Sequence, residues 1–220
     1  MADRGRTIRV PLDERVLNAN DEIAASTRAD LERRHILAID LIGAPGSGKT
    51  ALLEATLRAV RGRVRPAVLV GDLTTRRDGD RLAHWCDQVV QISTGQGCHL
   101  EAHQVRDALG QIRLEQIDLL FIENVGNLIC PVGFDLGQAA TVGLFSLTEG
   151  DDKAAKHPYL VETADLVLLN KIDLGPYLTF DRAGFEADVR LLNADVPILG
   201  VSAVTGEGLD AWLGWLEAPH

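Results

Sequence analysis

The stretch Gly43-Ala-Pro-Gly-Ser-Gly-Lys-Thr50 decides the fold, because its glycines, lysine and threonine have the spacing of a phosphate-binding loop. It lies between an apolar run at 36–42, typical of a buried strand, and a segment at 49–60 with apolar residues at helical spacing. In this setting backbone N–H groups wrap the phosphates, Lys49 reaches the β- and γ-phosphates, and the Thr50 hydroxyl can bind Mg²⁺. The residues expected to bind the phosphates are Gly43, Gly46, Ser47, Gly48, Lys49 and Thr50.

The base of the nucleotide is indicated by Asn170-Lys171-Ile172-Asp173, which follows an apolar run at 165–169. This motif resembles that of GTPases, in which the aspartate accepts hydrogen bonds from the guanine N1 and N2 groups, while the asparagine and lysine shape the ring pocket. An adenine would leave the carboxylate unpaired, which is costly. Ser202-Ala203 stands where such GTPases carry the loop behind the base. We therefore expect GTP rather than ATP, the alternative being an ordinary strand that ends in a polar turn.

Strand-like runs alternate with helical stretches along the whole chain. The runs lie at 36–42, 66–71, 88–92, 117–122, 141–147, 165–169 and 197–201. This alternation is typical of an α/β fold with a mostly parallel sheet and helices on both faces. Residues 1–34 mix apolar residues with many charges and predict an amphipathic helical extension, followed by one P-loop GTPase domain at 35–220.

The composition narrows the class of partners. The chain has 220 residues, of which 46% are hydrophobic, enough for one sizeable domain. Its formal net charge of −10 argues against nucleic acids and anionic membranes as partners, because both bind clustered lysine and arginine. No apolar run approaches the roughly 20 residues of a membrane span, and the N-terminus lacks the apolar core of a secretory signal. We expect a cytoplasmic protein whose three cysteines stay reduced.

The segment 123–130, ENVGNLIC, combines a carboxylate, a glycine and a thiol. Glu123 follows the run at 117–122, so its carboxylate is expected at the carboxyl end of a buried strand, where α/β folds bind ligands. Gly126 stands where a backbone amide could meet the γ-phosphate, and Cys130 belongs to the same loop. A nucleotide that moves this loop would also move the thiol.

Asp78 ends the segment GDLTTRRD, where a mobile loop could present it to Mg²⁺. It could equally be the N-cap of the helix that follows, since aspartate is favoured there. Asp72, Thr74 and Thr75 are further Mg²⁺ candidates in the same segment. The expected catalytic residues are Lys49, Thr50, Asp78, Glu123 and Gly126, of which Thr50, Asp78 and Glu123 would bind Mg²⁺.

Cys98, His99 and Cys130 are candidate ligands of a second metal, with His103 as a fourth. We expect the segment CHLEAHQV to be helical, so that His103 lies one turn after His99 on the same face. Thiolate and imidazole suit Ni²⁺, Zn²⁺ and copper ions better than Mg²⁺. The alternatives are that the two cysteines are small buried hydrophobic residues or form a disulfide. Cys86 lies among apolar residues and is expected in the core.

The phosphate loop occurs together with the segments GDLTTRRDGDR, STGQGCHLEAHQV, ENVGNLICPVGFDLG, TEGDDKAAKHP, NKIDL and SAVTGEGLDAWLGWL. In this order they resemble the nickel-incorporation GTPases that mature nickel-iron hydrogenases, a SIMIBI-class P-loop family, over about residues 30–217. The resemblance implies that Cys98, His99 and Cys130 bind Ni²⁺ or Zn²⁺ at or near the interface of a homodimer. It implies that His103 is used in only some members.

The resemblance also implies a cycle and its partners. GTP would be bound together with Mg²⁺ and hydrolysed slowly, because Asn127 follows Gly126 where fast GTPases often carry glutamine. Lys153 could reach the nucleotide of a neighbouring subunit. The metal would pass to a hydrogenase maturation chaperone and the hydrogenase large subunit. Residues 1–35 lack the cysteine-rich or histidine-rich nickel segment of many members, so a partner would have to supply the nickel.

Three other interpretations remain open. A urease accessory GTPase has the same fold, but its metal motif is typically Cys-Pro-His, whereas Cys98 and His99 are adjacent here. A GTPase chaperone of a cobalamin enzyme would use the phosphate loop without needing Cys98 and Cys130. A zinc-stabilised dimer could bind GTP only as a structural ligand.

Overall fold

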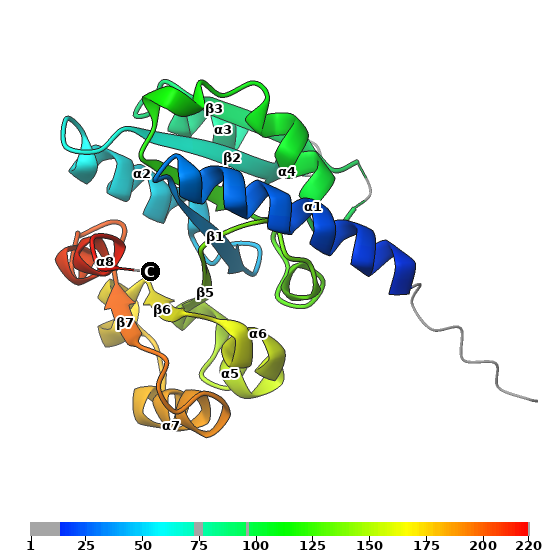
Figure 1. Ribbon diagram of the computed structural model, residues 1–220. Coiled ribbons are helices and arrows are strands. Elements are labelled where there is room, and N and C mark those ends of the chain that lie inside the picture. Colours follow the sequence, from blue (N-terminus) through cyan, green and yellow to red (C-terminus); the bar gives the residue numbers. More distant parts are fainter. Residues whose placement is uncertain (1–13, 73–76, 96, 220) are drawn as a thin grey trace, which may run out of the picture.

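The computed structural model describes residues 14–72, 77–95 and 97–219. Within these ranges seven parallel strands form one sheet in the order β3-β2-β4-β1-β5-β6-β7 (Figure 1). The strands are β1 (Leu37–Gly43), β2 (Pro66–Asp72), β3 (Val89–Ser93), β4 (Leu119–Glu123), β5 (Ala140–Ser146), β6 (Leu166–Asn170) and β7 (Ile198–Val201). Each strand begins and ends within two residues of a predicted run. The predicted α/β fold with a parallel sheet is therefore confirmed.

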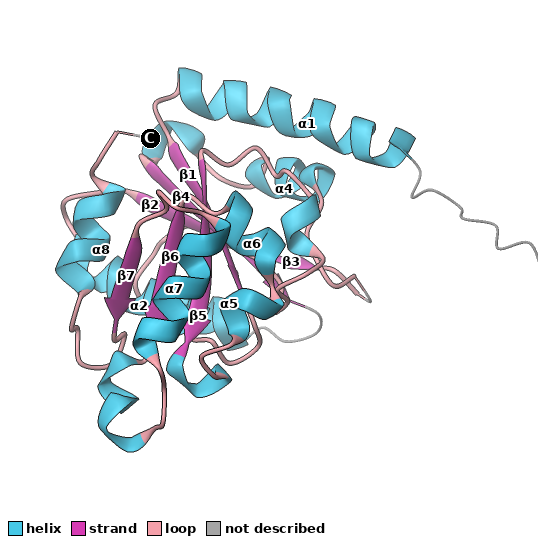
Figure 2. Ribbon diagram, turned by 90° about the horizontal axis from the view of Figure 1, so that it is seen from below, coloured by secondary structure: helices cyan, strands magenta, loops and turns pink. Residues whose placement is uncertain are grey.

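Helices cover both faces of the sheet, which explains why its strands are almost continuous apolar runs. The helices are α1 (Glu14–Arg33), α2 (Lys49–Val60), α3 (Arg77–Leu82), α4 (Ala102–Leu109), α5 (Lys153–Lys156), α6 (Pro158–Thr163), α7 (Arg182–Leu192) and α8 (Leu209–Leu216). One face packs against α2, α3 and α8, and its core includes the fully buried Trp212. On the other face, α1 and α4 cover β2 and β4, while α6 and α7 cover β5 and β6 (Figure 2).

Helix α1 packs on the domain rather than standing apart from it. Its buried Leu31 belongs to the core beneath α4. Asn20 Oδ1 accepts the N–H of Ala102 at 2.8 Å, and Arg28 pairs with Asp135 at 2.6 Å. Although α1 has 20 residues, none of the described helices is long and apolar enough to cross a membrane. Through Leu31 the predicted extension therefore contributes to the core on this face of the sheet.

The prediction that CHLEAHQV forms one helix is wrong. Helix α4 begins only at Ala102, after Glu101 as its N-cap. The N–H of Glu101 donates to Gln104 Oε1 at 3.0 Å. This hydrogen bond is half of a capping box, which marks the N-terminus of α4. His99 therefore lies in the loop before α4, and His103 lies inside the helix.

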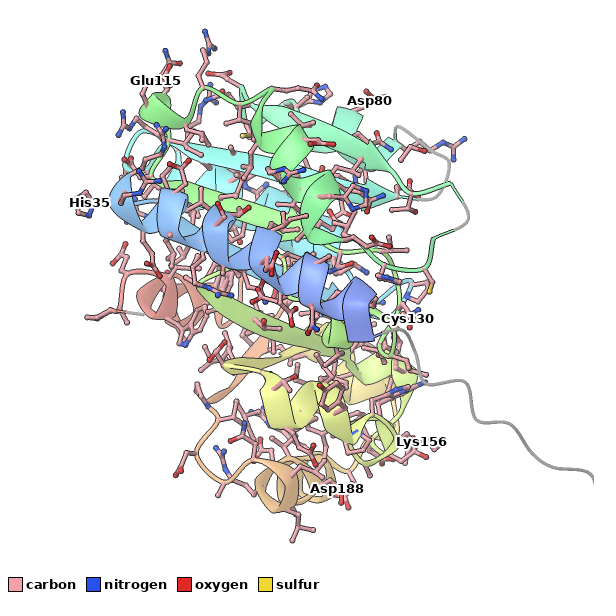
Figure 3. All side chains as sticks on the ribbon, turned by 45° about the vertical axis from the view of Figure 1, so that its right-hand side comes forward. His35, Asp80, Glu115, Cys130, Lys156 and Asp188 are labelled. Carbon is pink, nitrogen blue, oxygen red and sulfur yellow. The ribbon has the colours of Figure 1, made fainter. Side chains whose placement is uncertain are left out.

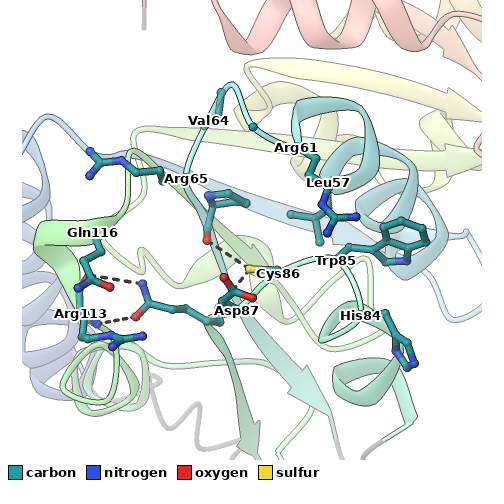
Figure 4. Close-up of a pocket in the computed structure, with 13 residues that line it drawn as sticks. Leu57, Arg61, Val64, Arg65, His84, Trp85, Cys86, Asp87, Arg113 and Gln116 are labelled. Atoms are coloured by element: carbon teal, nitrogen blue, oxygen red, sulfur yellow. Dashed lines mark hydrogen bonds between the residues drawn. The ribbon is translucent and has the colours of Figure 1, made fainter.

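Cys86 lies in the core, as predicted, at the opposite end of the strands from the phosphate loop. It follows α3, is 5% exposed, and its Sγ donates to Pro66 O at 3.2 Å and to Gln88 O at 3.4 Å. Cys86 is one of the residues that line a hollow of about 530 Å³ at the amino ends of β2 and β3 (Figure 4). Cys86 is therefore separate from the two other cysteines.

Candidate nucleotide site and metal cluster

The loop between β1 and α2 has a backbone shape that only glycines permit. Gly46 and Gly48 have positive φ angles of 80° and 97°, which side chains disfavour. A Cβ atom on Gly48 would lie 2.4 Å from Asn170 Nδ2, and one on Gly43 would lie 2.7 Å from Leu144 O. The loop is therefore pressed against the carboxyl ends of β5 and β6, where its N–H groups can wrap a phosphate chain.

Lys49 lies across the same loop, and the neutral carbonyl groups that contact its ammonium group compensate its positive charge only in part. The residue is 7% exposed, and its Nζ donates to Gly43 O at 2.9 Å and to Ala44 O at 3.3 Å. Burial lowers the pKa of its ammonium group, while the charge of Glu123 acts in the opposite direction. An ammonium group held by neutral carbonyls in a buried site favours an anion as an additional partner.

Thr50 and Glu123 are in direct contact, as Mg²⁺ ligands at one site would be. Thr50 Oγ1 donates to Glu123 Oε1 at 2.6 Å. Glu123 Oε2 and Ser47 Oγ are buried without a hydrogen-bond partner among the described residues. Burial also raises the pKa of Glu123 to about 7. A Mg²⁺ ion with a phosphate would satisfy these oxygen atoms, so the residues present fit this group.

Asp78 shares a hollow of about 410 Å³ with these residues. The hollow is lined by Gly46, Gly48, Lys49, Thr50, Asp72, Asp78, Arg81, Glu123 and Gly126, among others. Asp78 lies inside α3 rather than at its N-cap, and its Oδ1 lies 3.4 Å from Arg81 Nη1. The other candidates, Thr74 and Thr75, lie outside the described residues. The structure thus brings Asp78 and Glu123 to one cavity.

Asn170 and Lys171 join the base end of the site to the phosphate loop. Asn170 Nδ2 donates to Ser47 O at 2.9 Å, and Lys171 Nζ donates to Gly46 O at 2.6 Å. Lys171 has a positive φ of 61°, which turns the chain sharply after β6. These contacts tie the end of β6 to the loop between β1 and α2.

Asp173 and Ser202, which the sequence predicts to contact the base, lie in the segments that directly follow β6 and β7. Asp173 Oδ1 is buried without a hydrogen-bond partner among the described residues, so it can accept from the guanine N1 and N2 groups. Ser202 Oγ accepts from the N–H groups of Val204 and Thr205, and so shapes the turn that contains Ala203. The turn follows β7 and lies at the same edge of the sheet as Asn170.

Cys98, His99 and Cys130 meet at this edge from two loops that are distant in sequence. Their ligand atoms lie within 4.8 Å of one another, and Cys98 Sγ lies 3.5 Å from His99 Nδ1. Cys98 and Cys130 are both free, so neither the disulfide nor the buried-core alternative describes them. Figure 3 shows Cys130 on the opposite side of the molecule from His35, which precedes β1. Two thiols and an imidazole at this spacing can bind a soft divalent metal.

Comparison with known proteins decides the family. The sequence model described as "CobW/HypB/UreG, nucleotide-binding domain" matches residues 37–200. The chain belongs to this CobW/HypB/UreG family. The resemblance inferred from the motifs is thereby confirmed.

Similar members of the family are hydrogenase maturation factors called HypB. HypB of Escherichia coli strain K12 is 44% identical over 212 residues, which cover 96% of this chain and 72% of that protein. A crystal structure of HypB from Archaeoglobus fulgidus matches with a TM-score of 0.85 and 38% identity, covering 91% of this chain and 98% of that one. A crystal structure of HypB from Helicobacter pylori in complex with nickel matches with a TM-score of 0.86 and 35% identity. The match covers 90% of this chain and 93% of that one. A relative from Helicobacter hepaticus described as a hydrogenase/urease maturation factor HypB is 39% identical over 193 residues, which cover 86% of this chain and 79% of that protein.

In this member of the CobW/HypB/UreG family, the surroundings of the cluster favour a protonated Cys98 thiol and a neutral His99 imidazole. A hydrogen bond with Cys130 is the main cause that raises the pKa of the Cys98 thiol. Burial lowers the pKa of His99, whose Nε2 has no hydrogen-bond partner among the described residues. His99 is therefore neutral, as a metal ligand must be, and binding would release protons from the thiols. Its ring stacks on Phe134 with the centroids 3.9 Å apart.

His103 is not part of this three-residue cluster. Among the described residues the group of nearby potential ligands contains Cys98, His99 and Cys130. His103 Nδ1 lies 3.2 Å from Glu101 Oε2 instead. The expected pairing with His99 depended on a helix that starts at residue 98, and α4 starts four residues later.

Sequence reasoning missed Glu149, which lies beside the nucleotide site. Both carboxylate oxygens are buried without a hydrogen-bond partner among the described residues, and burial raises the pKa of this group. The charges of Lys153, Lys171 and Lys49 act on it in the opposite direction. A signal was present, because Glu149 comes three residues after the end of β5, at the same edge of the sheet where Glu123 ends β4.

Proposed function

We propose that the chain is a GTPase that carries nickel and delivers it during the maturation of nickel-iron hydrogenases. The observation that supports this most is the loop 123–130, which lines the nucleotide hollow at one end and bears Cys130 at the other. Asn127 bonds this loop to both sites, because its N–H donates to Gly43 O at 3.1 Å and its Nδ2 donates to Cys98 O at 3.3 Å. A shift of the loop on nucleotide binding would therefore move metal ligands.

The nucleotide roles follow from the contacts of the phosphate loop. Lys49 would exchange the carbonyl oxygens of Gly43 and Ala44 for the β- and γ-phosphates, and the N–H of Gly126 would meet the γ-phosphate. Mg²⁺ would be held by oxygen atoms of Thr50, Asp78 and Glu123, and when bound it neutralises phosphate charge. Hydrolysis would be slow, because Asn127 replaces the glutamine that positions water in fast GTPases.

Guanine would be selected by Asp173. Its unpaired Oδ1 would accept from the N1 and N2 groups, while an adenine would leave a buried carboxylate oxygen unsatisfied. Asn170, Lys171, Ser202 and Ala203 would shape the pocket around the ring. Lys153 would remain available to the nucleotide of a neighbouring subunit, since it begins α5 close to Glu149.

Nickel would be bound by Cys98, His99 and Cys130 as cargo. Three ligands leave a coordination position open for transfer, or they combine with the same three ligands of a second chain across a two-fold axis. We therefore infer a homodimer whose formation depends on nucleotide or metal. The acceptors would be a maturation chaperone and the hydrogenase large subunit. A binding change caused by GTP must be matched by an equal effect of nickel on GTP affinity.

Equilibrium dialysis of Ni²⁺ and Zn²⁺ tests the metal part. The samples are the wild type, Cys98→Ala, Cys130→Ala and the control Cys86→Ala, each with GDP and with a non-hydrolysable GTP analogue. Loss of binding in the first two variants only, with an affinity in the wild type that changes between nucleotides, is the expected result. Binding that is indifferent to Cys98 and Cys130 would sink the metal assignment.

Phosphate release from GTP tests the enzymatic part. We expect slow turnover that is faster with GTP than with ATP. A protein that binds GTP but releases no phosphate would be the zinc-stabilised dimer considered above. Size-exclusion chromatography of the same samples would then show whether the dimer requires nucleotide, metal or neither.

A further inference from the structure

Asp40 is a fully buried carboxylate that the nucleotide and metal roles leave unexplained. It lies in β1, three residues before the phosphate loop begins, and is 0% exposed. Burying a carboxylate away from water costs free energy unless hydrogen bonds or an opposite charge compensate for the lost hydration. Its side-chain donor is Asn124 Nδ2, at 3.2 Å from Oδ1 and 3.3 Å from Oδ2.

The other amide atom of Asn124, Oδ1, contacts the loop that carries the metal ligands Cys98 and His99. Its Oδ1 accepts from the N–H of Leu100 at 3.3 Å and from its neighbour Val125 at 3.0 Å. Leu100 directly follows His99 and is completely buried. Asn124 therefore joins the loop after β3 to the loop after β4, beside the link that Asn127 makes to Cys98.

The direction of the Asn124 amide depends on Asp40. An asparagine amide has nearly the same shape when it is turned over, so packing alone cannot decide which end carries the oxygen atom. When ionised, a carboxylate only accepts hydrogen bonds, and when protonated it keeps one oxygen atom that accepts, so in both states Asp40 can draw Nδ2 toward itself. The oxygen atom is then left facing the N–H of Leu100.

We propose that Asp40 is a positioning residue for the metal cluster: it orients Asn124, and Asn124 holds the Cys98–His99 loop against the loop of Cys130. This inference rests on the proposed metal site. Partners that orient ligands from outside a metal site typically change affinity by about 10- to 100-fold when they are replaced. Because Asp40 belongs to the strand that leads into the phosphate loop, it also gives the nucleotide site a second path to the cluster.

A double-mutant cycle with exchanged residues tests the proposal. In Asp40→Asn, either orientation of Asn124 leaves one buried NH₂ group without an acceptor. In Asn124→Asp, two carboxylates face each other. In the exchanged protein, Asp40→Asn with Asn124→Asp, the new Asn donates to the new Asp, which still accepts from Leu100 and Val125. Total charge is unchanged by the exchange.

The readouts are Ni²⁺ affinity by equilibrium dialysis and the thiolate-to-nickel absorption band, with circular dichroism to verify folding. Each single variant should bind Ni²⁺ about tenfold or more weakly with an altered band, and the exchanged protein should return to within about threefold of the wild type. The control Asp118→Asn removes a half-exposed carboxylate at the other end of β4 and should bind as the wild type.

Folded single variants that bind Ni²⁺ like the wild type would overturn the proposal. So would an exchanged protein that is folded but as weak as the single variants. If Asp40→Asn does not fold, the Ni²⁺ affinity of the exchanged protein alone tests the proposal. An affinity within about threefold of the wild type supports it, and a weaker affinity overturns it. Failure of the metal site itself is recognised separately, because Cys130→Ala would then also bind Ni²⁺ like the wild type.

Discussion

The two ends of the proposed coupling are built in different ways. The phosphate site is one continuous stretch, and its glycines and Lys49 make their contacts with residues of the same loop or of the strand ends directly beside it. The metal cluster is assembled from two loops, and its ligands are held by Asn124, Asn127 and Phe134. A continuous site fails when one of its own residues is changed. An assembled site also fails when residues that touch no ligand are changed.

Replacing Lys49 should give the largest effect, because the continuous site has no substitute for its charge. We expect Lys49→Ala to weaken nucleotide binding and lower GTP turnover by about 100-fold or more, in the range seen when a group that stabilises developing charge is removed. Isothermal titration with a GTP analogue and phosphate release measure both quantities. Arg58→Ala, at an exposed position of the same helix, serves as the control. Equal losses in the two variants would contradict a role specific to Lys49.

Replacing Asn127 should show that the assembled site depends on a residue that is not a ligand. Its Oδ1 accepts from the N–H groups of Ile129 and Cys130, at 2.8 and 3.4 Å, while its Nδ2 holds Cys98 O. Asn127→Ala should weaken Ni²⁺ binding by about 10- to 100-fold. It should also reduce the difference between the GDP and GTP-analogue states. Wild-type nickel affinity in the folded variant would argue that the cysteine loops hold themselves.

The same contrast explains how far the sequence could be interpreted. The phosphate loop and the strands of the described residues were predicted, because each depends on local pattern and on spacing along the chain, whereas the meeting of Cys130 with Cys98 and His99 was implied by the resemblance to a family. The start of α4, the role of Glu149 and the pair Asp40 and Asn124 were not predicted. Asp40 and Asn124 are 84 positions apart, and nothing in the sequence near either residue marks the other as its partner.

The pH dependence of stability should reveal the buried position of Asp40. Burial raises its pKa from 3.8 to about 7, against the effect of the hydrogen bond from Asn124. Between these values the folded chain keeps a proton that the unfolded chain releases. The free energy of unfolding therefore falls as pH rises through this window, by up to about 1.4 kcal/mol per pH unit from this group, and levels off above pH 7.

Urea unfolding of the wild type and Asp40→Asn at pH 5, 6 and 7 measures this contribution. The wild type should lose stability relative to the variant as pH increases, because the variant has no carboxyl group to titrate at this position. A difference between the two proteins that does not depend on pH would show that Asp40 is not buried as described. Such a result would also remove the basis for its control of Asn124.

The smallest expected effect concerns the ring that supports His99. Phe134 stacks on the imidazole with an angle of 27° between the planes, and a pair of this kind contributes about 0.5–1.5 kcal/mol. Phe134→Leu keeps an apolar side chain but removes the stacking, so Ni²⁺ affinity should fall by about two- to tenfold. The same change at Phe180, which packs on Phe185 of α7, should leave nickel binding unaltered. If both variants bind Ni²⁺ equally well, His99 is oriented by its own loop. The metal site would then depend mainly on its own residues, as the phosphate loop does.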